Sequence, residues 1–247
     1  MTLRARSDGA SADHIGSWAE FSDEIRTVNR YFPKSVPDLD LLSRVLRNTV
    51  VPVSTDVDLF RARVVDGATP SATAMGAPPA DRATSGRANP VGISYLYLAF
   101  SPDTCIYETR AGNHSTIAVG CFRPRDVLSV LNLADIEPPD FFSVVEVEAI
   151  DDQISQVAIH RYLKGLSAEL SKPVRSSDQP TDYIPTQYLC ELVKSLGIGG
   201  VLYPSSLHRG GRNVVLFDVS SAVCIDPPRL VQVTSLKAEW LFLDESD

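Results

Sequence analysis

Three observations predict that this sequence folds as an α+β domain. Strand-like and helix-like segments follow one another without the regular alternation that a doubly wound sheet requires. The chain has 247 residues, enough for one large domain with a small appendage. Hydrophobic residues make up 44% and charged residues 22%, a composition that can bury a substantial core. We therefore expect a mixed sheet core with flanking helices and a small N-terminal helical segment.

The N-terminal region divides into a polar tail and a helical collar. Residues 1–16 are small and polar, and we expect them to be disordered. Apolar residues then recur at steps of three and four, which predicts an amphipathic helix that ends at Pro33. These residues are Trp18, Phe21, Ile25, Val28 and Phe32. With a second helix over 38–48, we expect residues 17–50 to form a collar beside a main domain over 51–247.

The main domain opens with a strand and a long loop. "VDLFRARVV" at 57–65 is rich in β-forming residues, and about 27 residues rich in Gly, Pro, Ala, Ser and Thr follow it. An aperiodic segment of this length inside a compact domain is usually functional or disordered. "ISYLYLAF" at 93–100 is the next strand. In "SPDTCIYETRAG" we expect a helix with Ser101 as its cap, Pro102 in its first turn and Gly112 as its stop.

The second half of the chain mixes strands with two longer helices. Apolar periodicity predicts helices over 151–171 and 183–197. The strand-like runs are 115–122, 126–133, 200–206, 213–219 and 231–244. No internal repeat and no glycine-rich phosphate loop is present in the sequence.

Composition and motifs also indicate which partners to exclude. The net charge of −8 argues against the broad basic surface that nucleic-acid binding requires. No apolar run approaches the length of a membrane helix, and no apolar region follows the first basic residues as in a secretory signal. We expect a cytoplasmic protein without a nucleic-acid or membrane partner. The four cysteines and four histidines lack the spacing of zinc ligands, so we also expect no metal.

Several polar residues could carry chemistry, and each has an ordinary structural interpretation as well. Arg61 in "FRAR" is typical of an exposed strand arginine, and Arg87 in "GRANP" of an arginine that pins its loop. Tyr97 suits a core position with a satisfied hydroxyl. Glu108 follows the apolar "CIY", where a carboxylate needs a partner or a purpose. Serines 205–206 could cap a turn, and no G-x-S-x-G elbow marks a hydrolase nucleophile.

The order of these segments is more specific than any one of them. "FRAR", "GRANPVGISYLYLA", "TCIYE" and "GVLYPSS…GGRNVVLFD" together resemble the RES-domain family, which is named for its Arg, Glu and Ser. The resemblance runs from about residue 57 to 220 and leaves the N-terminal helices outside the shared core. Ala88 stands where many shorter members carry an aromatic residue. The stretch between Glu108 and the serines is also longer than in compact members.

The resemblance implies an ADP-ribosyltransferase-like fold in a catalytic domain that breaks the nicotinamide–ribose bond of NAD+. Several family members do so by phosphorolysis, and many are toxins that a partner antitoxin neutralises by plugging the active site. Carried over by position, the family's catalytic residues fall on Arg61, Arg87, Tyr97, Glu108 and Ser205. Further expected substrate-binding residues are Asn89, Ser206 and Asn213.

These residue types suit the chemistry that the resemblance implies. Arginine forks can clamp the diphosphate of NAD+ and an attacking inorganic phosphate, and Arg212 is a further candidate for this role. Tyr97 can stack on nicotinamide or ribose, and Glu108 can stabilise developing positive charge on the sugar. Strand alternation predicts that Ser205 faces the cleft and that the next serine points away.

Three activities fit this set of residues. The first is NAD+ degradation, by phosphorolysis to ADP-ribose-1″-phosphate or by hydrolysis. The second is ADP-ribosyl transfer to a macromolecule, and the third is a catalytically inactive module that binds the dinucleotide. The nicotinamide ring of NAD+ is cationic and departs as a neutral molecule, so the leaving group needs no general acid or metal. We therefore expect NAD+ to be a substrate and no separate cofactor or metal to be needed.

Overall fold

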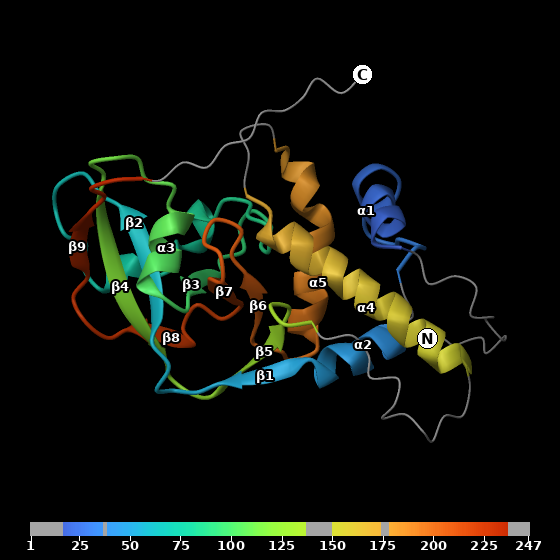
Figure 1. Ribbon diagram of the computed structural model, residues 1–247. Coiled ribbons are helices and arrows are strands. Elements are labelled where there is room, and N and C mark those ends of the chain that lie inside the picture. The colour runs from blue at the N-terminus through green and yellow to red at the C-terminus, as the bar shows by residue number, and fades with distance from the viewer. Residues whose placement is uncertain (1–16, 37–38, 137–149, 174–177, 237–247) are drawn as a thin grey trace.

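The structure, a computed structural model, describes residues 17–36, 39–136, 150–173 and 178–236, with the side chains of 150–156 left out (Figure 1). Its helices are α1 (Trp18–Thr27), α2 (Leu39–Asn48), α3 (Pro102–Glu108), α4 (Ile150–Ser171) and α5 (Ile184–Ser195). Its strands are β1 (Val50–Val53), β2 (Leu59–Val64), β3 (Leu96–Ala99), β4 (Thr116–Pro124), β5 (Leu128–Asn132), β6 (Gly200–Pro204), β7 (Arg212–Leu216), β8 (Ala222–Cys224) and β9 (Arg229–Gln232). The α+β class with a mixed sheet and flanking helices is confirmed. The expectations for residues 1–16 and for 237–244 lie outside the described ranges.

The strands form one mixed sheet in the order β1-β5-β6-β7-β3-β2-β4-β8, with β9 also paired to β4. Only the β5–β6 pair is parallel among these strands. A parallel pair needs a long crossover, and here α4 and α5 lie between the two strands in the sequence. The extra length between Glu108 and the serines therefore contains the helical crossover that connects the two parallel strands.

Helices α4 and α5 cover part of one face of the sheet (Figure 1). Val201 and Val215 belong to the same buried cluster as Leu163 of α4 and Val193 of α5. Strand pairing places Tyr97 opposite Val215, so Tyr97 lies on this same face. The helices cover only part of the face, and the uncovered part carries the polar residues of the candidate site.

The N-terminal helix is shorter than its apolar stripe predicts. Phe21 and Ile25 are buried against α4 and α5, as expected, but α1 ends at Thr27. Val28 and Phe32 are 78% and 81% exposed, so their assignment to the buried stripe is wrong. The side chain of Asn29 bonds both the carbonyl and the amide of Phe32, which closes a local turn in place of another helical turn.

The long loop between β2 and β3 is packed rather than extended. It contains two short 3-10 helices, η2 (Thr73–Met75) and η3 (Ala80–Arg82), and another, η4 (Pro180–Tyr183), precedes α5. Met75 and Ala88 are fully buried, so the loop contributes to both apolar clusters. This loop forms one wall of the candidate site.

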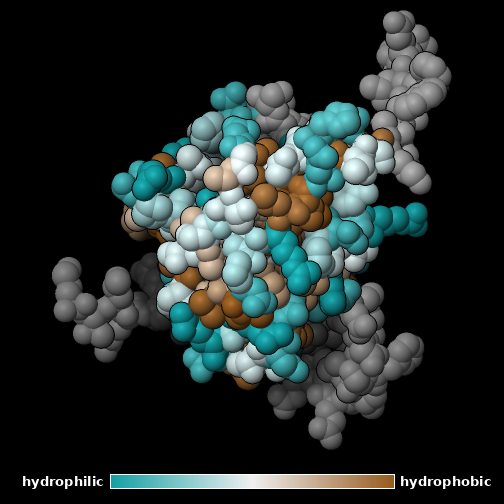
Figure 2. Space-filling view, turned by 90° about the vertical axis from the view of Figure 1, so that its left-hand side faces the viewer, coloured by the Kyte–Doolittle hydropathy of each residue, from teal (hydrophilic) through white to brown (hydrophobic). Residues whose placement is uncertain are grey.

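Several apolar side chains remain exposed on β2, β8 and β9, on the side of the sheet away from β1. They include Val64, Val223 and Leu230, which are 51%, 37% and 43% exposed. Figure 2 views the molecule from the left-hand side of Figure 1 and shows hydrophobic patches separated by hydrophilic surface.

Candidate active site

Helix α3 positions Glu108 at its last residue. Ser101 caps the helix by accepting a hydrogen bond from the Thr104 amide, and Pro102 opens the first turn, as the sequence predicts. The expected stop at Gly112 is wrong, because the Thr109 hydroxyl bonds the Ile106 carbonyl and ends the helix early. Since the helix has no further turn, the Glu108 side chain can reach the strands beside it.

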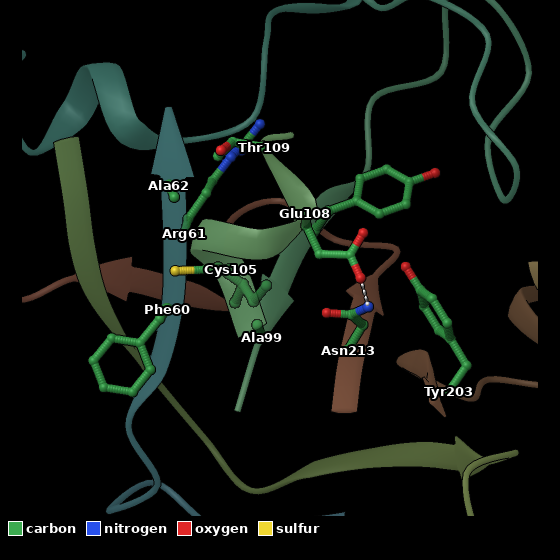
Figure 3. Close-up of a pocket in the computed structure, with 11 residues that line it drawn as sticks. Phe60, Arg61, Ala62, Ala99, Cys105, Glu108, Thr109, Tyr203 and Asn213 are labelled. Carbon is green, nitrogen blue, oxygen red and sulfur yellow. Dashed lines mark hydrogen bonds between the residues drawn. The ribbon is translucent and has the colours of Figure 1, made fainter. Parts of the chain in front are cut away.

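Two side chains from distant strands hold one oxygen of Glu108. Oε1 accepts hydrogen bonds from Ser205 Oγ and Asn213 Nδ2, each at 2.7 Å (Figure 3). Within the described residues, the other carboxylate oxygen has no hydrogen-bond partner. Glu108 is therefore fixed on one side and free on the other, as a carboxylate that meets a ligand should be.

Ser205 also organises the turn between β6 and β7. Its Oγ accepts hydrogen bonds from the amides of Leu207 and His208, and its own amide donates to the Gly211 carbonyl. The turn-capping interpretation of Ser205 is thus confirmed, and the same hydroxyl also holds Glu108. Ser206 is exposed and lines a cavity beside Glu108, so the expectation that it points away from the cleft is wrong; the chain turns after Pro204, where strand alternation no longer applies.

A cavity of about 230 Å³ lies in front of Glu108; we call it the β2 cavity. Its lining comes from β2, β3, α3, β6 and β7 and consists of Phe60, Arg61, Ala62, Tyr97, Leu98, Ala99, Cys105, Glu108, Thr109, Tyr203 and Asn213 (Figure 3). Arg61 and Glu108 are its charged residues, one from β2 and one from α3. The cavity combines an apolar wall with one cation and one carboxylate.

Arg61 is a partly buried cation that forms no ion pair within the described part of the chain. Its Nη1 is buried without a hydrogen-bond partner. Burial, and then the charge of Arg63, lower the pKa of Arg61 to about 10, so it remains charged at neutral pH. A desolvated guanidinium with an unused N–H beside a cavity is suited to an anionic ligand.

The "GRANP" loop is held by its own side chains. Asn89 Nδ2 donates to the carbonyls of Thr84, Pro90 and Ile93, while Asn89 Oδ1 accepts from the Tyr97 hydroxyl at 2.7 Å. These bonds use the polar atoms of Asn89 inside the loop, so the structure places this residue as a support of the loop. Direct contact of Asn89 with a substrate stays a prediction.

Gly86 is required by the same arrangement. A Cβ at this position would lie 2.5 Å from Asn89 Oδ1 and 2.9 Å from the Tyr97 hydroxyl. Gln187 of α5 also reaches this turn and donates to the carbonyls of Gly86 and Asn89. The loop is therefore tied to both the sheet and the helical layer.

Arg87 is bound to the end of helix α4. Its terminal nitrogens donate to the carbonyls of Glu169 and Pro173 and to Asp178, at 3.1, 2.8 and 3.2 Å. Its guanidinium also lies 5.0 Å from the ring centroid of Tyr183. Arg87 thus pins its loop, while it also borders a second cavity.

This second cavity, of about 220 Å³, adjoins the first; we call it the α4 cavity. Its lining consists of Gly86, Arg87, Tyr97, Glu108, Arg110, Leu170, Ser171, Lys172, Pro173, Tyr203, Ser206 and Asn213. Four of these residues line both cavities, namely Tyr97, Glu108, Tyr203 and Asn213. Three cations and one carboxylate line the α4 cavity, which makes its lining predominantly basic.

The sequence did not point to several residues that line the cavities, and one candidate for anion binding lies outside both. Tyr203, Arg110 and Lys172 were not expected, although strand alternation in "GVLYP" could have placed Tyr203 on the face of Val201. Arg212 was a candidate for anion binding, but its guanidinium lies 5.1 Å from the Phe100 ring centroid and it lines neither cavity.

Two further features of the described residues bear on the expected partners. Within those residues, no three His, Cys, Asp or Glu side chains gather as metal ligands do. None of the helices there combines the length and apolar character needed to span a membrane. The absence of a metal remains a prediction.

Comparisons with known proteins place the site in a family. A search of curated proteins found no match. Among solved structures, the chain is similar to the toxin–antitoxin complex MbcT–MbcA of M. tuberculosis, with 16% identity, a TM-score of 0.40, and coverage of 80% of this chain and 94% of that chain. The family model described as "RES domain" matches residues 58–239, which include β2, Glu108 and the serines. The chain therefore belongs to the RES domain family.

Proposed function

We propose that this protein degrades NAD+ by breaking the bond between nicotinamide and ribose. The observation that carries the proposal is the β2 cavity, where the unpaired Arg61 and the half-free Glu108 line one space. A ligand that is anionic at one point and develops positive charge at another matches both residues. NAD+ is such a ligand, because its diphosphate is anionic and its ribose becomes cationic as nicotinamide leaves.

The two adjoining cavities support a substrate with two halves. They meet at the four shared residues, so a ligand that passes Glu108 can occupy both. Arg61 lies without an ion pair on one side. Arg87, Arg110 and Lys172 line the other side, where Arg87 pairs with Asp178 and Lys172 with Glu169. Cations on both sides of a carboxylate suit a molecule that carries phosphates near a sugar.

In the proposed step the bond between C1″ of ribose and N1 of nicotinamide breaks. Its electron pair stays with the ring and neutralises the pyridinium charge, while an acceptor oxygen forms the new bond to C1″. The sugar passes through an oxocarbenium-like state, which the carboxylate of Glu108 stabilises more than it stabilises the ground state. Ser205 and Asn213 keep Glu108 in place, so little reorganisation accompanies the reaction.

We assign inorganic phosphate as the preferred acceptor, with water as the alternative. Three cationic side chains line the α4 cavity, and a second anion beside the substrate would compete there with Asp178 and Glu169, the carboxylates that pair with Arg87 and Lys172. With phosphate, the product is ADP-ribose-1″-phosphate and the displaced nicotinamide is neutral. With water, the product is ADP-ribose and a proton is released.

The biological role that we propose is that of a toxin that depletes NAD+ and that a cognate antitoxin restrains. Support for this role comes from membership of the RES family, because many members act in this way. An antitoxin that fills the β2 cavity would block Arg61 and Glu108 together.

One experiment separates the candidate activities. Purified protein is incubated with NAD+, with and without inorganic phosphate, and the products are identified by mass spectrometry. ADP-ribose-1″-phosphate supports phosphorolysis, and ADP-ribose alone supports hydrolysis. ADP-ribose attached to a macromolecule supports ADP-ribosyl transfer. Intact NAD+ that nevertheless binds would indicate an inactive binding module. A Glu108→Gln variant serves as the control for contaminating activity.

A further inference from the structure

We propose that Tyr203 supplies the free phenol of this site and donates a hydrogen bond to an oxygen of the bound substrate beside Glu108, whereas Tyr97 acts as a positioning residue. This inference rests on the proposed function, because it names a further residue of the same reaction. The two tyrosines line the same two cavities, so the distinction depends on what their hydroxyl groups already bond.

The hydroxyl of Tyr97 is already occupied by the loop. It donates to Asn89 Oδ1 at 2.7 Å and accepts from the Ala88 amide at 3.3 Å. A phenol has one proton to donate, so Tyr97 has no donor left for a substrate in this arrangement. Its ring can still pack against a ligand, and its hydroxyl holds the loop that carries Arg87.

The hydroxyl of Tyr203 is free in the described part of the chain, where it makes no hydrogen bond. The phenols of Tyr95 and Tyr162 also lack partners there, but their oxygens are sealed from solvent in the core. The Tyr203 oxygen is not sealed in this way, and its ring lines both cavities. Its hydroxyl can therefore reach a ligand.

The neighbours of Tyr203 fix where this donor acts. Tyr203 pairs with Asn213 across β6 and β7, and Asn213 holds Glu108. Figure 3 shows the Tyr203 hydroxyl on the side of Glu108 and Asn213. A substrate oxygen that Tyr203 reaches is thus close to the sugar that Glu108 stabilises.

The environment keeps this hydroxyl protonated. Burial raises the pKa of Tyr203, and the nearby phenol of Tyr97 and carboxylate of Glu108 raise it further. A protonated phenol is a donor across the whole neutral range. The acceptors that it suits are the oxygens of ribose or of an attacking phosphate, both of which lie at the reacting centre.

The test compares two variants that each lose one hydroxyl, measured on the full chain. For Tyr203→Phe we expect kcat/KM for NAD+ to fall at least about tenfold with an unchanged thermal midpoint, as for a lost hydrogen bond to the reacting substrate. For Tyr97→Phe we expect a lower midpoint and faster amide exchange over residues 84–93, because the loop loses its anchor. Tyr188→Phe, in the helical layer, is the matched control and should leave both measurements unchanged.

The outcomes separate this inference from the proposed function. If the wild type consumes NAD+ and Tyr203→Phe matches it in kcat/KM, the role of Tyr203 is overturned and the proposed function stands. If Tyr203→Phe instead lowers the thermal midpoint as Tyr97→Phe does, the residue is structural and the inference fails. A folded wild type that neither binds nor consumes NAD+ overturns both.

Discussion

Arg61 and Arg87 border adjoining cavities, yet only the guanidinium group of Arg87 has ion-pair and hydrogen-bond partners among the described residues. Arg87 is held by two carbonyls, a carboxylate and an aromatic ring, although its Nε is also buried without a hydrogen-bond partner. Arg61 has a buried Nη1 without a partner and forms no ion pair within the described residues. Arg87 thus stabilises its loop, whereas Arg61 on β2 remains available for a ligand. The predictions below test this division between a ligand-binding region and a supporting one.

The largest effect is expected at the carboxylate of the β2 cavity. Glu108→Gln keeps the shape and the bonded oxygen but removes the negative charge, so we expect kcat to fall about 100-fold or more while NAD+ still binds. Steady-state NAD+ consumption and calorimetric binding measure the two quantities. Near-normal turnover in the folded variant would exclude this role for Glu108.

The two arginines should respond differently to the same substitution. Arg61→Lys keeps a charge but loses the planar fork, and we expect kcat/KM to fall about tenfold or more with an unchanged thermal midpoint. Arg87→Lys should weaken dinucleotide binding as well as lower the midpoint by about 2–4 °C per kcal/mol of lost stability, because several contacts to α4 disappear. Identical effects of both variants on kinetics and midpoint would contradict the division.

The serine pair tests the same division on a smaller scale. Ser205 bonds Glu108, whereas the exposed Ser206 lines only the α4 cavity. We expect Ser205→Ala to cost about 1–3 kcal/mol of transition-state stabilisation, and Ser206→Ala to cost less. Steady-state kinetics of both variants measures the costs, and a more damaging Ser206→Ala would reverse the assignment.

The smallest effect is expected at the ion pair between Arg87 and Asp178. Asp178→Asn removes the ion pair and leaves the two carbonyl contacts of Arg87, so we expect a loss of about 1 kcal/mol in unfolding free energy. Urea unfolding of the wild type and the variant measures this loss. In an Arg87→Gln background, where the positive charge is gone, the loss should shrink, and full additivity in that double-mutant cycle would show that the pair contributes nothing.

Much of the fold could be predicted from local patterns, because the helices and strands follow apolar periodicity. The errors concern where two helices end, at points where side chains compete with the backbone for hydrogen bonds. Asn29 closes a turn after α1, and Thr109 ends α3 before Gly112. Such local hydrogen bonds do not change the apolar pattern, so periodicity alone extends both helices too far.

The sequence named several residues of the candidate site, but it did not show which partners surround them in the fold. The segment order of the RES family identified Arg61, Glu108 and Ser205 as candidates. In the structure Arg61 and Glu108 line one cavity, and Ser205 bonds Glu108 at its rim. The partners of Arg87 lie 82, 86 and 91 residues away along the chain, so no local pattern could show that it is occupied. Tyr203 was missed because a sequence cannot show whether a hydroxyl has a partner.

The crossover between β5 and β6 also determines when the site can be completed during synthesis. Glu108 is separated from Ser205 by 97 residues and from Asn213 by 105, and the crossover helices lie between them. Contacts of this range form slowly, and a chain folds from its N-terminus as it is made. A nascent chain therefore carries Arg61 and Glu108 long before the strands that anchor the carboxylate exist. The proposed activity would thus begin only when synthesis of the chain is nearly finished.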